Sequence, residues 1–160
     1  MGKIIWLASY PKSGNTWLRI LLTNYWRNGD QPASINQLEP TPLASSRILF
    51  DDLVGIESAN LSHDEIDRFR PAFYLRWANQ HPSTTFLKVH DAYRLLPDGR
   101  PLLPADATAG AIYLLRNPLD VALSLAAHNG ESVDQSIAAL QQADYALCAA
   151  SHKQHPQLRQ

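Results

Sequence analysis

The fold is decided by residues 4–17, which read Ile-Ile-Trp-Leu-Ala-Ser-Tyr-Pro-Lys-Ser-Gly-Asn-Thr-Trp. An apolar run, a tight turn and a helix start follow one another here, the layout of a phosphate-binding loop. The nucleotide-triphosphate version of that loop is Gly-x-x-x-x-Gly-Lys-[Ser/Thr]. Aligned on Thr16, the chain has Gly14 at the second glycine and Asn15 in place of the lysine. Because the loop lysine is instead Lys12, we expect backbone N–H groups to hold phosphate while the charge approaches from another side.

The composition is that of a single soluble globular domain, residues 1–160, with 45% hydrophobic and 18% charged residues. A net charge of −1 argues against a general nucleic-acid or membrane surface. The single cysteine, Cys148, cannot form an internal disulfide, which fits a reducing compartment. The first apolar run is too short and too polar at its end for a signal peptide, and no run approaches the roughly 18 residues of a membrane span. We therefore expect a cytoplasmic protein that binds neither nucleic acid nor membrane.

Strand and helix patterns alternate along the chain. Apolar and β-branched runs predict strands at residues 3–8, 85–90 and 111–115. Helical spacing and capping signals predict helices at residues 16–28, from 63 onward, at 118–128 and at 133–150. Strands that alternate with helices indicate an α/β domain with a central parallel sheet.

Two signals conflict in the helix that begins near residue 63. Ser62-His63-Asp64-Glu65 fits a capping box and predicts the helix start. Pro71 lacks the backbone N–H of an interior helical residue, so we expect it to kink or divide this helix.

Polar residues follow each of the three predicted strands, at the sheet edge where ligands of open α/β sheets bind. The first group is residues 12–17. Lys88 and His90 form the second; they share one strand face, and a histidine can act as a general base near neutral pH. Arg116 and Ser124 form the third, and an arginine can bind a phosphate in a bidentate manner. Each group taken alone also fits a structural role, as an ordinary turn, a hydrogen-bonded histidine or a surface salt bridge.

Together the three segments resemble the cytosolic-type sulfotransferase family. The 5′-phosphosulfate loop of that family resembles Tyr-Pro-Lys-Ser-Gly-Thr-Thr-Trp, and residues 10–17 differ only at Asn15, which can still donate to a phosphate oxygen. The family's Arg-Asn-Pro-x-Asp-x-x-x-Ser segment is matched in full at 116–124, and its Lys-x-His at 88–90. The resemblance covers roughly residues 3–130. It implies the N-terminal portion of a sulfotransferase domain, a three-layer P-loop-type fold whose parallel sheet is incomplete.

The resemblance also implies an activity. A sulfuryl group would pass from 3′-phosphoadenosine 5′-phosphosulfate (PAPS), a co-substrate, to a hydroxyl or amine of a small-molecule acceptor, without a metal. His90 would be the base that takes the acceptor proton, and Lys12 with Lys88 would stabilise charge on the bridging oxygen. The 3′-phosphate would be bound by Arg116 and Ser124. The residues that would bind the 5′-phosphosulfate and nearby adenine are Lys12, Ser13, Gly14, Asn15, Thr16 and Trp17.

The acceptor pocket is left open by the sequence. Its candidates are the loop-rich residues 29–60 and an aromatic set whose helical spacing fits a core equally well. This aromatic set is Phe69, Phe73, Tyr74, Trp77 and Tyr93.

Members of this family continue well beyond the length of this chain, with a further strand and a basic segment over the 3′-phosphate. Residues 131–160 contain only a predicted helix and a polar tail, so we expect weakened cofactor binding and an exposed sheet edge. Such an edge predicts homo-oligomerisation or strand exchange. Two other interpretations stay open: a P-loop nucleotide kinase, and a non-catalytic nucleotide-binding remnant of the sulfotransferase fold. The kinase needs a lysine at position 15 and a metal-binding carboxylate after the third strand.

Overall fold

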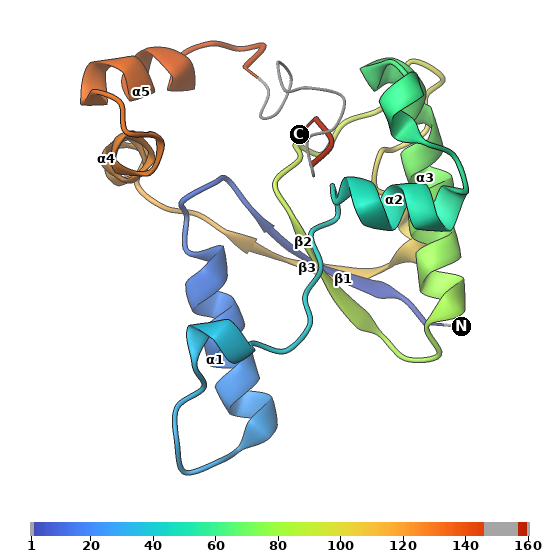
Figure 1. Ribbon diagram of the computed structural model, residues 1–160, viewed down its shortest axis with the longest axis horizontal. Helices are drawn as coiled ribbons and strands as arrows, with labels where there is room; N and C mark the ends of the chain where they lie inside the picture. Colours follow the sequence, from blue (N-terminus) through green and yellow to red (C-terminus); the bar gives the residue numbers. More distant parts are fainter. Residues whose placement is uncertain (1, 146–156, 160) are drawn as a thin grey trace.

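The computed structural model describes residues 2–145 and 157–159, built around a parallel sheet with the strand order β2-β1-β3 (Figure 1). The strands are β1 (Ile4–Ser9), β2 (Thr85–Val89) and β3 (Thr108–Leu114). The central strand β1 pairs with both neighbours, and its apolar sequence follows from burial under helices on both faces. The predicted α/β class with a parallel sheet is confirmed.

The third strand begins earlier than its sequence predicts. It starts at Thr108 instead of Ala111 and includes Ala109 and Gly110, two residue types of low strand propensity. These residues pair with the first residues of β1, where the register shifts between Ile4 and Ile5. Pairing with an existing strand thus outweighs the local propensity.

The described residues contain five α-helices, of which four overlap predicted helices and one was not predicted. They are α1 (Asn15–Arg27), α2 (Arg47–Val54), α3 (His63–Gln80), α4 (Pro118–Asn129) and α5 (Val133–Leu140). Short 3-10 turns lie at Ile35–Gln37, Ser58–Asn60 and Ala105–Ala107. Helix α2 was not predicted, although it has ordinary caps, a Ser46 hydroxyl that accepts from Leu49 N and Gly55 at a φ of 77°. Helix α5 ends earlier than predicted, and residues 146–150 of the predicted helix lie outside the described residues.

Helix α3 confirms the predicted capping box and contradicts the division predicted at Pro71. The Ser62–Glu65 capping box is present, with Ser62 N donating to Glu65 Oε2 at 2.8 Å. Pro71 lies inside a continuous helix, so the predicted division is wrong. The turns after Pro71 carry Phe73 and Tyr74 into the core, and this burial outweighs the one hydrogen bond that proline cannot make.

The two faces of the sheet carry different helices (Figure 1). Trp6 and Leu87 lie in the core cluster with residues of α2 and α3, and the Trp6 ring meets Tyr74 edge-on at 5.0 Å. Alternation along the strands turns Phe86 and Lys88 to the opposite face, where α1 lies. There the ring of Trp26 on α1 contacts Phe86, with centres 4.9 Å apart. Lys88 therefore shares its face with the helix that begins at the phosphate loop.

The two sheet edges differ. On the outside of β2, Lys88 N donates to Pro42 O at 2.9 Å and Ala44 N donates to Lys88 O at 2.8 Å. Residues 42–44 thus cover that edge. On the other side, β3 pairs only with β1 as far as the described residues go, and Tyr113 is 66% exposed. Strand exchange at this second edge stays a prediction.

A segment from the end of the chain packs into the core. Leu158 is 1% exposed within the cluster formed with α2 and α3, and its N–H donates to Ser45 O at 2.8 Å. The polar composition around Leu158 gave no sign of this contact. Helix α2 and the preceding loop therefore hold residues 157–159 in place.

Candidate functional site

The loop after β1 presents an uncapped helix N-terminus. Lys12 and Gly14 both have left-handed φ values, 67° and 104°, which turn the chain sharply into α1. Gly14 is the N-cap and brings no side-chain cap, and the first helical hydrogen bond runs from Leu18 N to Gly14 O at 3.0 Å. The amides of Asn15 and Thr16 precede that bond, so this end of α1 suits an anion.

The side chain of Asn15 fastens the loop to the sheet. It is 5% exposed, and its Nδ2 donates to Leu7 O at 2.9 Å and to Ser9 Oγ at 3.2 Å. Both side-chain N–H groups are therefore directed at β1. The expectation that this amide donates to a phosphate does not fit this geometry, which leaves the backbone N–H of Asn15 for that purpose.

The ring of His90 lies just past the end of β2, with Nδ1 2.7 Å from Ser9 O and 3.4 Å from Ser9 Oγ. A carbonyl oxygen only accepts, so Nδ1 carries the hydrogen and Nε2 of the neutral ring keeps its lone pair. Burial lowers the pKa of His90, and the nearby Lys88 cation lowers it further, against the opposing effects of the Ser9 hydrogen bond and Asp91. The lowered pKa thus favours the neutral ring, with Nε2 as its unprotonated nitrogen.

Lys88 lies in a cluster of cations. Burial lowers the pKa of its ammonium group, and the charges of Arg19 and Lys12 lower it further. Arg19 extends from α1, and its Nε donates to Thr41 Oγ1. Arg19 belongs to none of the three motifs; its position one helical turn after Asn15, on the helix that starts at the loop, is the sequence signal that indicates it.

The third motif reaches the first through Arg116. Its Nη1 donates to Lys12 O at 3.0 Å, while the guanidinium is exposed. The following Asn117 caps α4, with Oδ1 accepting from Leu119 N at 3.0 Å. This helix then places Ser124, which is half-buried, on the same side as the loop.

The three motifs surround one cleft of about 890 Å³. Of the predicted site residues, those that line it are Lys12, Gly14, Asn15, Thr16, Trp17, Lys88, His90 and Ser124. Ser13 and Arg116 do not line it; Ser13 is 8% exposed, and its amide closes the loop turn on Tyr10 O. Pro11 of the loop motif and Leu43 of the acceptor-pocket candidate residues 29–60 also line the cleft. The lining residues that the sequence did not suggest are Ile20, Leu125, His128, Asn129, Tyr145 and Gln157. They come from loops and helix faces that carry no motif.

The aromatic set proposed for the core or the acceptor pocket divides between core and surface. Phe73 and Tyr74 are at most 2% exposed and belong to the core, whereas Phe69 and Tyr93 are exposed. Trp77 is half-buried and donates to Thr85 Oγ1. None of the five is among the residues that line the cleft.

Residues 2–145 and 157–159 contain neither a cluster of metal-ligand side chains nor a membrane-spanning helix. No group of three or more histidine, cysteine or acidic side chains in this part of the chain could hold a metal ion. None of the helices in the same part has the length and apolar character required to cross a bilayer.

Comparison with known proteins agrees with the site. The family model described as "Sulfotransferase domain" matches residues 3–153. Luciferin sulfotransferase of Photinus pyralis is 28% identical over 125 residues, which cover 76% of this chain and 32% of that protein. No solved structure matches the chain. The family match spans nearly the whole sequence and contains all three motifs, and the chain belongs to the sulfotransferase domain family.

Proposed function

We propose that the cleft binds PAPS and that the chain carries the donor-binding and base residues for sulfuryl transfer to a hydroxyl or amine. The observation that carries this proposal is the convergence of Lys12, Lys88, His90 and Ser124 on one cleft at the carboxyl edge of the sheet. These residues lie at or after the carboxyl ends of three different strands, and ligands of open parallel sheets bind at such an edge.

The residues of the cleft suit the two anionic groups of the donor. The uncapped N-terminus of α1 and the Lys12 ammonium fit a 5′-phosphosulfate. Arg116, already beside the loop through Lys12 O, and Ser124 provide a separate site for a 3′-phosphate. Trp17 is 65% exposed at the cleft, where its face is available to an adenine ring.

When bound, PAPS supplies a sulfuryl group whose bond to the phosphate oxygen breaks as a bond to the acceptor oxygen or nitrogen forms. His90 Nε2 takes the acceptor proton, because Nδ1 is committed to Ser9 O. Lys12 and Lys88 place positive charge where negative charge develops on the leaving oxygen. Positioning and charge stabilisation by these side chains are what such a transfer needs.

The donor site is tested by binding of adenosine 3′,5′-bisphosphate, the product that PAPS leaves. At a ligand concentration of about 100 times Kd, we expect the folded chain to gain about 2.7 kcal/mol, seen as a higher Tm. Lys12→Ala is expected to abolish this rise. Lys3→Ala, which removes an exposed lysine outside the cleft, should leave it unchanged. Absence of any rise in the unsubstituted chain would contradict the proposed donor site.

The pH dependence of transfer follows from two lowered pKa values. Only neutral His90 can accept a proton, so kcat/KM should rise with pH through a midpoint below the ordinary value of 6.5. Lys88 must stay charged, so the rate should fall again with a midpoint below 10.5. Initial rates across this pH range measure both limbs. Lys88→Arg should move the alkaline limb upward and leave the acid limb in place; an acid limb above 6.5 would count against His90 as the base.

A further inference from the structure

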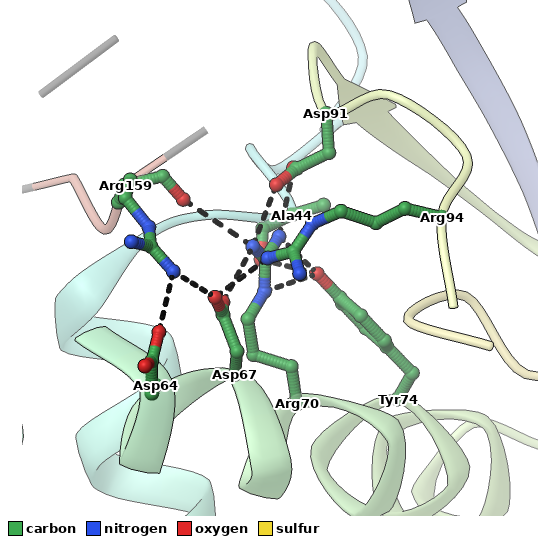
Figure 2. A network of polar contacts seen from close by, with 8 residues as sticks. All are labelled: Ala44, Asp64, Asp67, Arg70, Tyr74, Asp91, Arg94 and Arg159. Carbon is green, nitrogen blue, oxygen red and sulfur yellow. Dashed lines mark hydrogen bonds and ion pairs between the residues drawn. The ribbon is translucent and has the colours of Figure 1, made fainter. Parts of the chain in front are cut away.

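Arg70 is a fully buried cation outside the cleft. It lies on α3 at 0% exposure and is the largest of the fully buried side chains (Figure 2). Removing a guanidinium from water is costly unless charges and hydrogen bonds satisfy it. Its partners therefore indicate what it holds in place.

Those partners meet the guanidinium at several points. Nη1 and Nη2 donate to the two carboxylate oxygens of Asp91 at 2.6 and 2.7 Å. Nε and Nη2 donate to the Tyr74 hydroxyl at 3.1 and 2.7 Å. Burial raises the pKa of Tyr74 to about 12, so this hydroxyl keeps its proton and donates to Ala44 O at 3.2 Å. Arg70 thus binds both carboxylate oxygens of Asp91, and the surrounding core fixes the position of its guanidinium.

The residue before Asp91 is His90. Strand β2 ends at Val89, so both residues lie beyond the ladder and depend on side-chain contacts for their position. The His90 ring is held on the α1 side of the sheet by Ser9 O. The Asp91 carboxylate is held on the opposite side by Arg70 on α3. Side-chain hydrogen bonds on opposite faces of the sheet therefore fix the positions of His90 and Asp91.

We propose that Arg70 is a positioning residue that acts through Asp91 to keep the His90 ring with Nδ1 on Ser9 O and Nε2 directed to the cleft. The description of His90 as a base rests on the proposed function, but the orientation of its ring does not. Without the two hydrogen bonds from Arg70, Asp91 and the adjoining backbone shift, and the hydrogen bond from His90 Nδ1 to Ser9 O is lost.

The surrounding ion pairs separate the effect of Arg70 on Asp91 from the effects of the other cations. Among the ion pairs of the described residues, the Asp91 carboxylate is paired with Arg70. Asp67 nearby has several cations, with Arg94 at 2.6 Å and Arg159 at 2.7 Å in addition to Arg70 at 3.5 Å. Removing Arg94 therefore disturbs the same network without touching Asp91 (Figure 2). The charges that act on the His90 ring are Lys88, two residues earlier on β2, and Asp91.

The test is NMR of the His90 ring nitrogens in the full chain, which distinguishes a hydrogen on Nδ1 from one on Nε2; His90→Gln assigns the signals. The unsubstituted protein should show the Nδ1–H form at a pH above the ring pKa. Arg70→Lys keeps the positive charge but loses the planar guanidinium that donates to two oxygens at once. Asp91→Asn keeps the size of the side chain but loses its negative charge. Both should lose the pure Nδ1–H signature and show Nε2–H. Arg94→Gln should retain it.

Retention of the Nδ1–H form in folded Arg70→Lys and Asp91→Asn would overturn the proposal. Its loss in Arg94→Gln as well would also overturn it, since the whole network would then be responsible. If one substitution prevents folding, the other decides. In the transfer reaction, the same two variants should lose roughly 100-fold in kcat with little change in donor KM. A chain that binds no donor but shows these ring signals would contradict the proposed function and leave the positioning role supported.

Discussion

Replacing His90, the proposed base, with glutamine is expected to slow the proposed sulfuryl transfer by about 10²- to 10⁴-fold, the usual contribution of a general base. Glutamine retains a donor that can reach Ser9 O, but it has no basic nitrogen with which to take the acceptor proton. Donor binding should persist, because Lys12, Ser124 and the N-terminus of α1 are unchanged. The measurement is single-turnover transfer of radiolabelled sulfate at saturating donor, beside the Tm rise with adenosine 3′,5′-bisphosphate.

The matched control for this change is His128→Gln. His128 lines the same cleft from α4, so its loss alters the lining and the histidine count in the same way. We expect it to keep transfer close to the original rate. Equal losses from the two substitutions would show that His90 has no special role, and an unchanged rate in His90→Gln would exclude it as the base.

Replacing Arg70 with alanine is expected to lower the free energy of unfolding by about 3–5 kcal/mol. The substitution leaves the 4% exposed Asp91 carboxylate without its cation and leaves a cavity beside Tyr74. A domain of this size is stable by only about 5–15 kcal/mol, so this loss is a large part of the total. Urea unfolding followed by tryptophan fluorescence measures it.

Arg100→Ala is the control for that experiment. Arg100 pairs with Asp98 at 2.6 Å, the same nitrogen–oxygen distance as between Arg70 and Asp91, but both partners are about half exposed. We expect little change in the free energy of unfolding, because water screens the pair and solvates the remaining carboxylate. Similar losses for both substitutions would mean that burial does not set the energy of the Arg70 contact.

Much of the site could be predicted because its signals are local. Lys12 to Trp17 sits directly after an apolar strand, and Lys88 and His90 share a face by simple alternation. The parallel sheet then brings separate strand ends to one edge, so three short motifs were enough to predict where the cleft forms.

The remaining features depend on contacts that no local pattern encodes. The Arg70–Asp91 pair joins residues 21 positions apart, on a helix and beyond a strand. Pro71 stays inside a helix because the burial of later residues in the core outweighs the hydrogen bond that proline cannot make. Leu158 enters the core from a polar segment. The side chain of Asn15 donates to Leu7 O and to the Ser9 hydroxyl, and both partners come within its reach only after the loop has folded.

The strand order β2-β1-β3 also has a consequence for how the protein folds. Of the three strands, the central one comes first in the sequence, and its two sheet partners follow it by about 80 to 100 positions. The Ser9–His90 and Lys12–Arg116 contacts span 81 and 104 positions. Closing such long loops in a parallel sheet is slow, so the cleft should be among the last parts to form, well after α1 and α3 have become helical.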